Sequence, residues 1–380
     1  MNNKLIILVL AILIIVFTVL AVLYVNKLSS NTTSSARVQN NGQKLSSNDS
    51  TSKPSRLDVQ DEKIDYVEEI NVYNAAEYMD MNTIKNFEKE FKIKVNYKEF
   101  DSNESMYKDV ASNKNKYDVL IPSDYMIDRL IKEDLVEKFN KANIPNIANI
   151  AEEYLNPEYD KNNEYVVPYM VGTVGILYNK SIVKETVDSW NILWDERYKG
   201  QIWLWDSMRD VIGVSLKRLG YSMNSTNDAE LNEAKQALIK QKDLLRGFAE
   251  EEVRDSMIAD EGSLALVYAG EAKSAIDQNP NLAYVIPNEG SNKFVDGFVI
   301  VKGTSHKTAA EKFINYMCQA NIAIRNMTET GYTSPVKGAW AEFGDNKIMF
   351  PQDSELARCE AFLYDAGATE KYNKIWNEVR

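Results

Sequence analysis

The chain has 380 residues, which is long enough for two lobes that each bury a core of their own. Its 56 acidic and 44 basic residues give a formal net charge of −12, which argues against nucleic acid as a partner, because phosphate binding needs a basic face. Two cysteines and one histidine disfavour a zinc site and a cysteine–histidine nucleophile pair.

The first segment of the chain predicts a membrane anchor. Residues 5–25 read LIILVLAILIIVFTVLAVLYV, without a charged residue. About 20 apolar residues cross a bilayer core, whereas a cleavable signal peptide usually has an apolar region of about 7–15 residues. No cysteine stands in or just after the segment to carry a lipid. We therefore predict an uncleaved transmembrane anchor over residues 1–27, with cleavage as the alternative, and a chain that continues outside the cytoplasmic membrane.

A flexible linker is predicted for residues 28–65. Residues 29–55 are rich in Ser, Asn, Thr and Gln and hold few apolar side chains, so they cannot bury enough surface to fold. The folded part is expected to begin near Tyr66.

Strands and helices alternate in the first part of the folded region. The predicted strands are 69–75, 94–100 and 117–121, and the predicted helices are 82–92, 105–112 and 124–135. Such alternation indicates a parallel sheet in an α/β fold. Ligands bind beyond the carboxyl ends of such strands, which directs attention to residues 74–78, 122–125 and 206–210.

A second α/β unit is predicted after Gly172. Its predicted strands are 176–178, 201–205, 263–268, 284–287 and 294–301, and its predicted helices are 231–245 and 306–318.

Ten short motifs occur in order between Glu69 and Arg380. They are VYNAAEY (72–78), DSNESMY (101–107), YDVLIPSDY (117–125), VPY (167–169), SWNILW (189–194), YKG (198–200), DSMRD (206–210), LGY (219–221), PNEG (287–290) and GYTSP (331–335). In content and spacing they resemble the motifs of bacterial polyamine-binding proteins, the spermidine/putrescine receptors of ABC importers. The resemblance implies the α/β fold of a type II periplasmic binding protein, with two α/β lobes joined by hinge strands, here preceded by one N-terminal transmembrane helix.

The implied fold also divides the chain. Lobe 1 is expected to comprise residues 66–172 and 295–342, and lobe 2 residues 173–294 and 343–380. Cys318 and Cys359 then fall on different lobes. A disulfide between them would lock a hinge that has to move, so we expect two free, buried thiols.

A polyamine carries ammonium groups on a methylene chain. Each ammonium needs carboxylates to offset its desolvation, and the methylenes and the charge both suit aromatic faces. The ligand contacts that the resemblance implies are Glu77, Tyr78, Ser123, Tyr125, Asp210, Tyr268, Glu271, Phe294, Asp296 and Tyr332. Asp296 is the principal candidate, because an acid within the apolar run FVDGFVIV needs a partner if it is buried.

Several of these residues also fit structural roles. Tyr78 is compatible with a core aromatic. Ser123 fits the N-cap of the helix that follows it, and Asp124 fits an acid in the first helical turn. The pair Ser207 and Asp210 resembles a capping box.

Three positions depart from the family pattern. Ala75 stands where the family usually has a tryptophan that stacks on the ligand, Ser207 replaces an acid, and Phe362 stands where some members have a glutamine. These differences put spermidine-like specificity in question and leave a shorter or different cation open. Trp205 is either a core residue or an aromatic contact for the ligand that replaces the tryptophan missing at Ala75.

The sequence thus predicts an extracytoplasmic, membrane-tethered substrate-binding protein that captures a polyamine, putrescine or spermidine, and delivers it to the permease subunits of an ABC importer. We expect a monomer without cofactor, metal or catalytic residues. The alternatives are the same scaffold with another small cationic or amino-acid-like ligand, and a membrane-tethered sensor. An enzyme that uses carboxylates alone is the remaining alternative, although no phosphate loop, nucleophile elbow or His-Glu-x-x-His motif is present.

Overall fold

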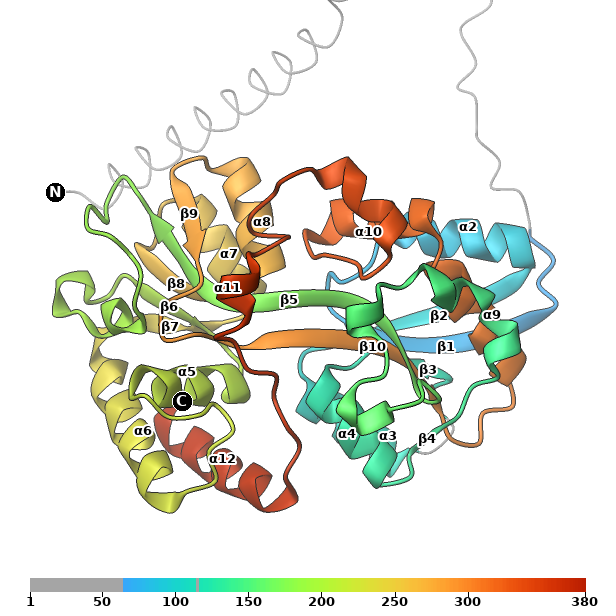
Figure 1. The fold of residues 1–380 in the computed structure, drawn as a ribbon, viewed down its shortest axis with the longest axis horizontal. Coiled ribbons are helices and arrows are strands. Elements are labelled where there is room, and N and C mark those ends of the chain that lie inside the picture. Colours follow the sequence, from blue (N-terminus) through green and yellow to red (C-terminus); the bar gives the residue numbers. More distant parts are fainter. Residues whose placement is uncertain (1–63, 114–115) are drawn as a thin grey trace, which may run out of the picture. The chain divides into compact units, whose positions relative to one another are not determined.

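The computed structural model of the protein describes residues 64–113 and 116–380 (Figure 1). The predicted anchor over residues 1–27 and nearly all of the predicted linker over residues 28–65 lie outside the described residues. Within the described part of the chain, no helix has the length and apolar character needed to cross a membrane.

Ten strands form one sheet within this described part, in the order β2-β1-β3-β10-β5-β8-β6-β7, with β4 paired to β10 and β9 paired to β5. The strands are β1 (Glu68–Ala75), β2 (Ile93–Phe100), β3 (Val119–Leu120), β4 (Val136–Glu137), β5 (Val166–Asn179), β6 (Ile202–Trp205), β7 (Leu245–Ala249), β8 (Leu264–Tyr268), β9 (Leu282–Val285) and β10 (Lys293–Val301). We call β2, β1 and β3 the first half of the sheet, and β8, β6 and β7 the second half.

The two long strands β5 and β10 connect these halves. Figure 1 shows them side by side, each running from one group of strands into the other. The predicted lobe boundaries at 172/173 and 294/295 both fall inside these strands. Such continuous strands are what a hinge between two lobes requires, and the division into lobes at these residues remains a prediction.

The sheet is mixed, so the prediction of a parallel sheet is only partly right. β1 pairs in parallel with β2 and β3, and β6 pairs in parallel with β7 and β8. β10, however, is antiparallel to β3, β4 and β5, and β5 is also antiparallel to β8 and β9. The reason is topological: β5 leads the chain out of the first half, and β10 brings it back beside β5 in the opposite direction.

Helices cover both faces of both halves. They are α2 (Met81–Phe91), α3 (Asn103–Ser112), α4 (Asp124–Lys132), α5 (Met208–Arg218), α6 (Asp228–Gln241), α7 (Glu251–Ile258), α8 (Ala269–Gln278), α9 (Lys307–Met317), α10 (Ala320–Thr330), α11 (Asp353–Leu356) and α12 (Ala366–Val379). Of these, α7, α8, α10, α11 and α12 were not predicted from the sequence, and neither were the strands β4 and β7.

The alternation of side chains along β1 explains how the first half is packed. Val72 points to the face covered by α2, α9 and α10, where it joins a cluster that includes Phe87 and Phe313. Tyr73, the next residue, joins a cluster with Met106 of α3 and Met126 of α4 on the opposite face.

The second half repeats this arrangement on β8. Leu266 belongs to a cluster with side chains of α5, α6 and α12, such as Ile212 and Tyr372. Its neighbour Val267 belongs to a smaller cluster with Val253 of α7 and Ala272 of α8. Each half therefore has apolar layers on both faces, and its strand ends are left for polar residues.

Both cysteines are free and buried, as predicted. Burial raises the pKa of the Cys318 thiol to about 12, so this side chain stays protonated and inert at neutral pH.

Gly290 offers a test of how the C-terminal segment is attached to the start of β10. Its φ is +90°, and an added Cβ would lie 1.9 Å from the carbonyl oxygen of Arg358. We expect Gly290→Ala to lower the free energy of unfolding by more than about 2 kcal/mol, because backbone strain and a backbone clash add up. The measurement is thermal unfolding of the full-length chain in detergent micelles.

Gly220→Ala is the matched control, because Gly220 has a similar φ of +84° but no atom within 4 Å of an added Cβ. It should cost only the strain of the left-handed conformation, about 1–2 kcal/mol. Equal losses of unfolding free energy in the two variants would show that the close approach of Gly290 to Arg358 does not matter for stability.

Candidate functional site

The candidate site is centred on Asp296, in the middle of β10. Its carboxylate accepts a hydrogen bond from the Tyr78 hydroxyl at 2.7 Å, and Ser123 lies beside it in an isolated antiparallel bridge. The register of β10 against β5 shifts between Asp296 and Gly297. The side chain is buried, and its second oxygen, Oδ1, has no hydrogen-bond partner. An acceptor that is buried and unsatisfied is costly, so this oxygen is available for a donor.

A row of aromatic rings extends from this carboxylate. The ring of Tyr78 packs against Tyr332 at 4.9 Å between centroids, and Tyr332 packs against Phe294 at 6.1 Å. Phe294 in turn contacts Tyr268 at 5.6 Å, and Tyr268 contacts Trp205 at 5.4 Å. All four contacts are edge-on, so adjacent rings face different directions. Such a row offers both apolar surface for methylenes and ring faces for a cation.

A second buried acid, Asp210, lies at the Tyr268 end of this row. Oδ2 of Asp210 accepts hydrogen bonds from the hydroxyls of Tyr268 and Ser207, each at 2.7 Å, and Oδ1 accepts one from the Asn292 amide at 3.0 Å. Burial raises the pKa of Asp210. Ser207 is also the N-cap of α5, where its Oγ accepts from the Asp210 N–H at 3.5 Å. Only half of the capping box that the sequence suggested is present. Ser207 caps the helix, but the Asp210 carboxylate accepts from the hydroxyls of Ser207 and Tyr268, and the Ser207 backbone N–H donates to the Trp205 carbonyl.

A third acid, Asp124, lies in the first turn of α4, which is the structural role that its sequence position suggested. It is buried, and its oxygens accept from the backbone N–H groups of Tyr125 at 2.7 Å and Val295 at 3.4 Å. Burial raises the pKa of Asp124 to about 8.

Ser123 occupies the N-cap position of α4, but its side chain makes no capping hydrogen bond. The suggestion that its hydroxyl caps the helix is wrong. The hydroxyl accepts instead from the Asn103 amide at 3.1 Å, because α3 lies close enough to compete for it.

Asp124, Asp210 and Asp296 make no ion pair with a lysine or arginine in the described part of the chain; their partners are hydroxyl, amide and backbone groups. Burial raises the pKa of Asp296 to about 6, although the hydroxyls of Tyr78 and Ser123 oppose the rise. The charge of Arg209 opposes the rise in pKa of Asp124 and Asp210, but no cation among the described residues contacts any of the three carboxylates directly. A buried carboxylate without a contacting cation is unfavourable when ionised, and a bound cation relieves that cost. The arrangement is therefore suited to binding a cation between acids and aromatic rings.

Two other predicted residues, Glu77 and Glu271, are brought together by a cation of the protein itself. Nη1 of Arg254 lies 2.9 Å from Oε2 of Glu77 and 3.1 Å from Oε2 of Glu271. Burial raises the pKa of Glu271 to about 7, and Arg254 opposes the rise. These acids differ from Asp296 and Asp210, because they already have a positive partner.

The remaining predicted residue, Tyr125, lies beside a buried arginine. Its hydroxyl bonds Glu104 at 3.0 Å, and the guanidinium of Arg209 lies 5.6 Å from its ring centre. Arg209 also stacks 4.4 Å from the ring of Phe362, one of the positions that depart from the family pattern. Phe362 thus contributes to the surroundings of Arg209 from the C-terminal segment.

Three contributors were missed from the sequence: Arg209, Arg254 and Asn292. Arg254 lies in the charged run EEVRD, which is typical of a solvated helix, and only the tertiary fold turns it toward Glu271. Arg209 did have a signal, because it lies inside the DSMRD motif beside Asp210.

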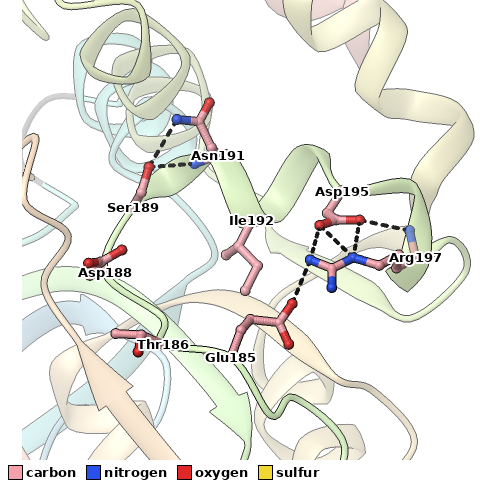
Figure 2. Close-up of a pocket in the computed structure, with 8 residues that line it drawn as sticks. All are labelled: Glu185, Thr186, Asp188, Ser189, Asn191, Ile192, Asp195 and Arg197. Carbon is pink, nitrogen blue, oxygen red and sulfur yellow. Dashed lines mark hydrogen bonds and ion pairs between the residues drawn. The ribbon is translucent and has the colours of Figure 1, made fainter.

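A pocket of about 230 Å³ lies elsewhere, in the segment after β5 (Figure 2). Figure 2 shows the guanidinium of Arg197 between the carboxylates of Asp195 and Glu185, so the main charges of this pocket are already paired. None of the residues predicted to bind a ligand lines it. In the described part of the chain, no group of His, Cys, Asp and Glu side chains is arranged to hold a metal ion.

This fold, with a polar site at the crossing of its two halves, is that of a solute-binding protein. The chain belongs to the family of bacterial extracellular solute-binding proteins, whose family model matches residues 82–353. Together with the relatives described next, this match confirms the family recognised from the ten motifs and the predicted periplasmic-binding-protein fold.

Three relatives show how close the similarity is. The chain is 31% identical over 315 residues to the spermidine/putrescine-binding periplasmic protein of Escherichia coli K12, covering 81% of this chain and 90% of that protein. It is 27% identical over 336 residues to the putrescine-binding periplasmic protein of the same strain, covering 82% and 91%. The solved structure of a spermidine/putrescine ABC transporter substrate-binding protein from Streptococcus pneumoniae has a TM-score of 0.71 and 33% identity, covering 82% of this chain and 98% of that chain.

The raised pKa of Asp296 predicts a pH-dependent stability. The folded-state pKa of about 6 exceeds the ordinary 3.8, so the ligand-free folded state loses stability as pH rises from about 4 through 6. Asp296→Asn removes this loss. The free energy of unfolding of the variant, minus that of the unsubstituted chain, should therefore rise by about 2 kcal/mol between pH 4.5 and pH 8. The measurement is thermal unfolding of the ligand-free, full-length chain at both pH values.

Asp128→Asn, at a less buried position of α4 that pairs with Lys132, is the control and should show no such trend. The raised pKa of Asp296 would be contradicted if the difference in unfolding free energy between Asp296→Asn and the unsubstituted chain did not change with pH.

Proposed function

We propose that this chain is the extracytoplasmic substrate-binding protein of an ABC importer and that its ligand is a polyamine. The observation that carries the proposal is the set of buried carboxylates, Asp296 and Asp210, that have only uncharged donors and are joined by a row of aromatic rings. The curated relatives named above bind spermidine and putrescine according to their names, which supports the same class of ligand here.

In the proposed mechanism, one ammonium group of the ligand donates to Asp296, whose Oδ1 has no other donor. A second ammonium donates to Asp210. The methylenes between them lie along Phe294, Tyr268 and Tyr332. Each charge pair forms away from water, where the attraction is strong but desolvation is costly, so both partners must be satisfied together.

The binding residues come from both halves of the sheet. Tyr78 and Ser123 follow strands of the first half, whereas Asp210 and Tyr268 belong to the second half. Asp296 and Phe294 lie on β10, which runs between the halves. We therefore propose that the halves are the two predicted lobes, that β5 and β10 are the hinge, and that the closed form docks on the permease.

The family is defined by solute binding, in agreement with the expectation that the chain is not an enzyme. The tether over residues 1–27, a monomeric state and delivery to permease subunits are the remaining parts of this proposal. The tether would keep the binding protein close to its permease and raise the effective concentration of each for the other.

The direct test is calorimetric titration of the ligand-free, full-length chain in detergent micelles with putrescine, spermidine and spermine. Saturable binding of one or more of them is expected. Asp296→Ala should weaken that binding at least about ten-fold, because a buried ammonium loses its main partner, at a cost of about 2–5 kcal/mol. Asp128→Ala removes the same charge outside the site and should leave affinity unchanged.

The proposal fails in either of two cases. No heat with any of the three amines from a folded sample would mean that the scaffold serves another ligand. Unchanged affinity in Asp296→Ala would mean that the amine binds elsewhere.

A further inference from the structure

We propose that Arg254 is a built-in counter-cation at one end of the ligand site, and that it makes the site select a diamine over a triamine. This inference rests on the proposed polyamine function. It concerns a residue of α7 that belongs to none of the ten motifs.

Arg254 contacts three carboxylates, of which only that of Glu271 is largely buried. A single nitrogen, Nη1, contacts Glu77 at 2.9 Å and Glu271 at 3.1 Å, and Nε contacts Asp255 at 3.1 Å. The side chain is only 16% exposed, and that of Glu271 only 12%. The Arg254–Glu271 pair is therefore largely shielded from solvent, where ion pairs are stronger than on the surface.

Glu271 borders the same row of aromatic rings that reaches Asp296. The ring of Tyr332 lies directly on the preceding residue, Gly270, since a Cβ added there would be 2.2 Å from Cδ2 of Tyr332. The charge of Glu271 contributes to the raised pKa of Tyr332. Tyr332 in turn packs on Tyr78 and Phe294, which flank Asp296. Glu271 is thus the acid that a longer cation would reach after Asp296.

The acids of the site therefore divide into two kinds. Asp296 and Asp210 have hydroxyl and amide donors and can each accept an ammonium. Glu271 already accepts from a guanidinium. A further ammonium brought to Glu271 would have to compete with that guanidinium for the same carboxylate and would be repelled by its charge, although Glu77 and Asp255 offset part of that charge. Two ammonium groups are accommodated, and a third is opposed.

A rival role for Arg254 is a simple latch, because Glu77 belongs to the loop after β1 and Glu271 to α8. The two roles differ in what they predict. A latch stabilises the closed form whichever ligand is bound, so its loss weakens every amine equally. A counter-cation acts on one end of the site, so its loss changes the ratio between amines.

The experiment compares R254Q with the unsubstituted full-length chain in detergent micelles, titrated with putrescine and with spermidine. The ratio of the two dissociation constants should shift toward spermidine by about ten-fold or more, while the Kd for putrescine changes less than about three-fold. R254K keeps the charge and should keep the original ratio. R246Q is the matched control, because Arg246 pairs with the exposed Glu261 outside the site.

The double variant R254Q/E271Q removes both charges and should return the ratio close to that of the unsubstituted chain, because the freed carboxylate is what recruits the third ammonium. If R254Q alone does not fold, the double variant and R254K are each compared with the unsubstituted chain. A double variant whose ratio shifts toward spermidine would then overturn the proposal, because it has no freed carboxylate to recruit a third ammonium.

Equal weakening of both amines in R254Q, or an unchanged ratio, would likewise overturn it. A failure of the proposed function would look different. In that case the unsubstituted chain itself would bind neither putrescine nor spermidine.

Discussion

The structure depends on one costly arrangement, an acid placed inside a strand that crosses the protein. Asp296 interrupts the apolar sequence of β10 and is buried where β10 leaves its register with β5. Neither β5 nor β10 can be displaced without separating the two halves of the sheet. The carboxylate is consequently fixed on a strand that joins the two halves, beside Tyr78 and Ser123, and the surrounding hydroxyls supply only part of what an ionised carboxylate needs.

This incompleteness explains why stability and binding oppose each other in the site. A core built for stability would pair Asp296 and Asp210 with arginines or replace them by apolar residues, since a satisfied or absent charge costs less than an isolated one. The protein keeps them with weak partners. Arg254 shows the other solution within the same chain, because Glu271, a few residues from Tyr268, has its cation supplied by α7. The contrast separates acids kept for a ligand from an acid already satisfied.

Much of this site could be predicted, because its residues are local in sequence to strand ends. Glu77, Tyr78, Ser123 and Asp210 each follow a strand that the apolar pattern identifies, and Asp296 stands out as a charge in an apolar run. What could not be predicted is which acid meets which base. Arg254 reaches Glu77 across 177 residues of sequence, and nothing in EEVRD marks that contact. The parallel sheet was inferred from strand–helix alternation, which does not reveal that β10 returns beside β5. The capping role of Ser123 failed for a similar reason, since Asn103 on a neighbouring helix competes for the same hydroxyl.

The path of the chain through the two crossing strands also sets the order in which the protein can fold. Val72 of β1 packs in one cluster with Phe313 of α9 and Ile322 of α10, residues that are made about 240 positions later. The first half of the sheet therefore cannot close its core until the chain has been made through α10. The second half completes its core no earlier, because its largest cluster joins Leu266 of β8 to Tyr372 of α12, close to the end of the chain. β10, which carries Asp296, is therefore made before either half can complete its core, and the acid is buried only when the later helices pack on both halves.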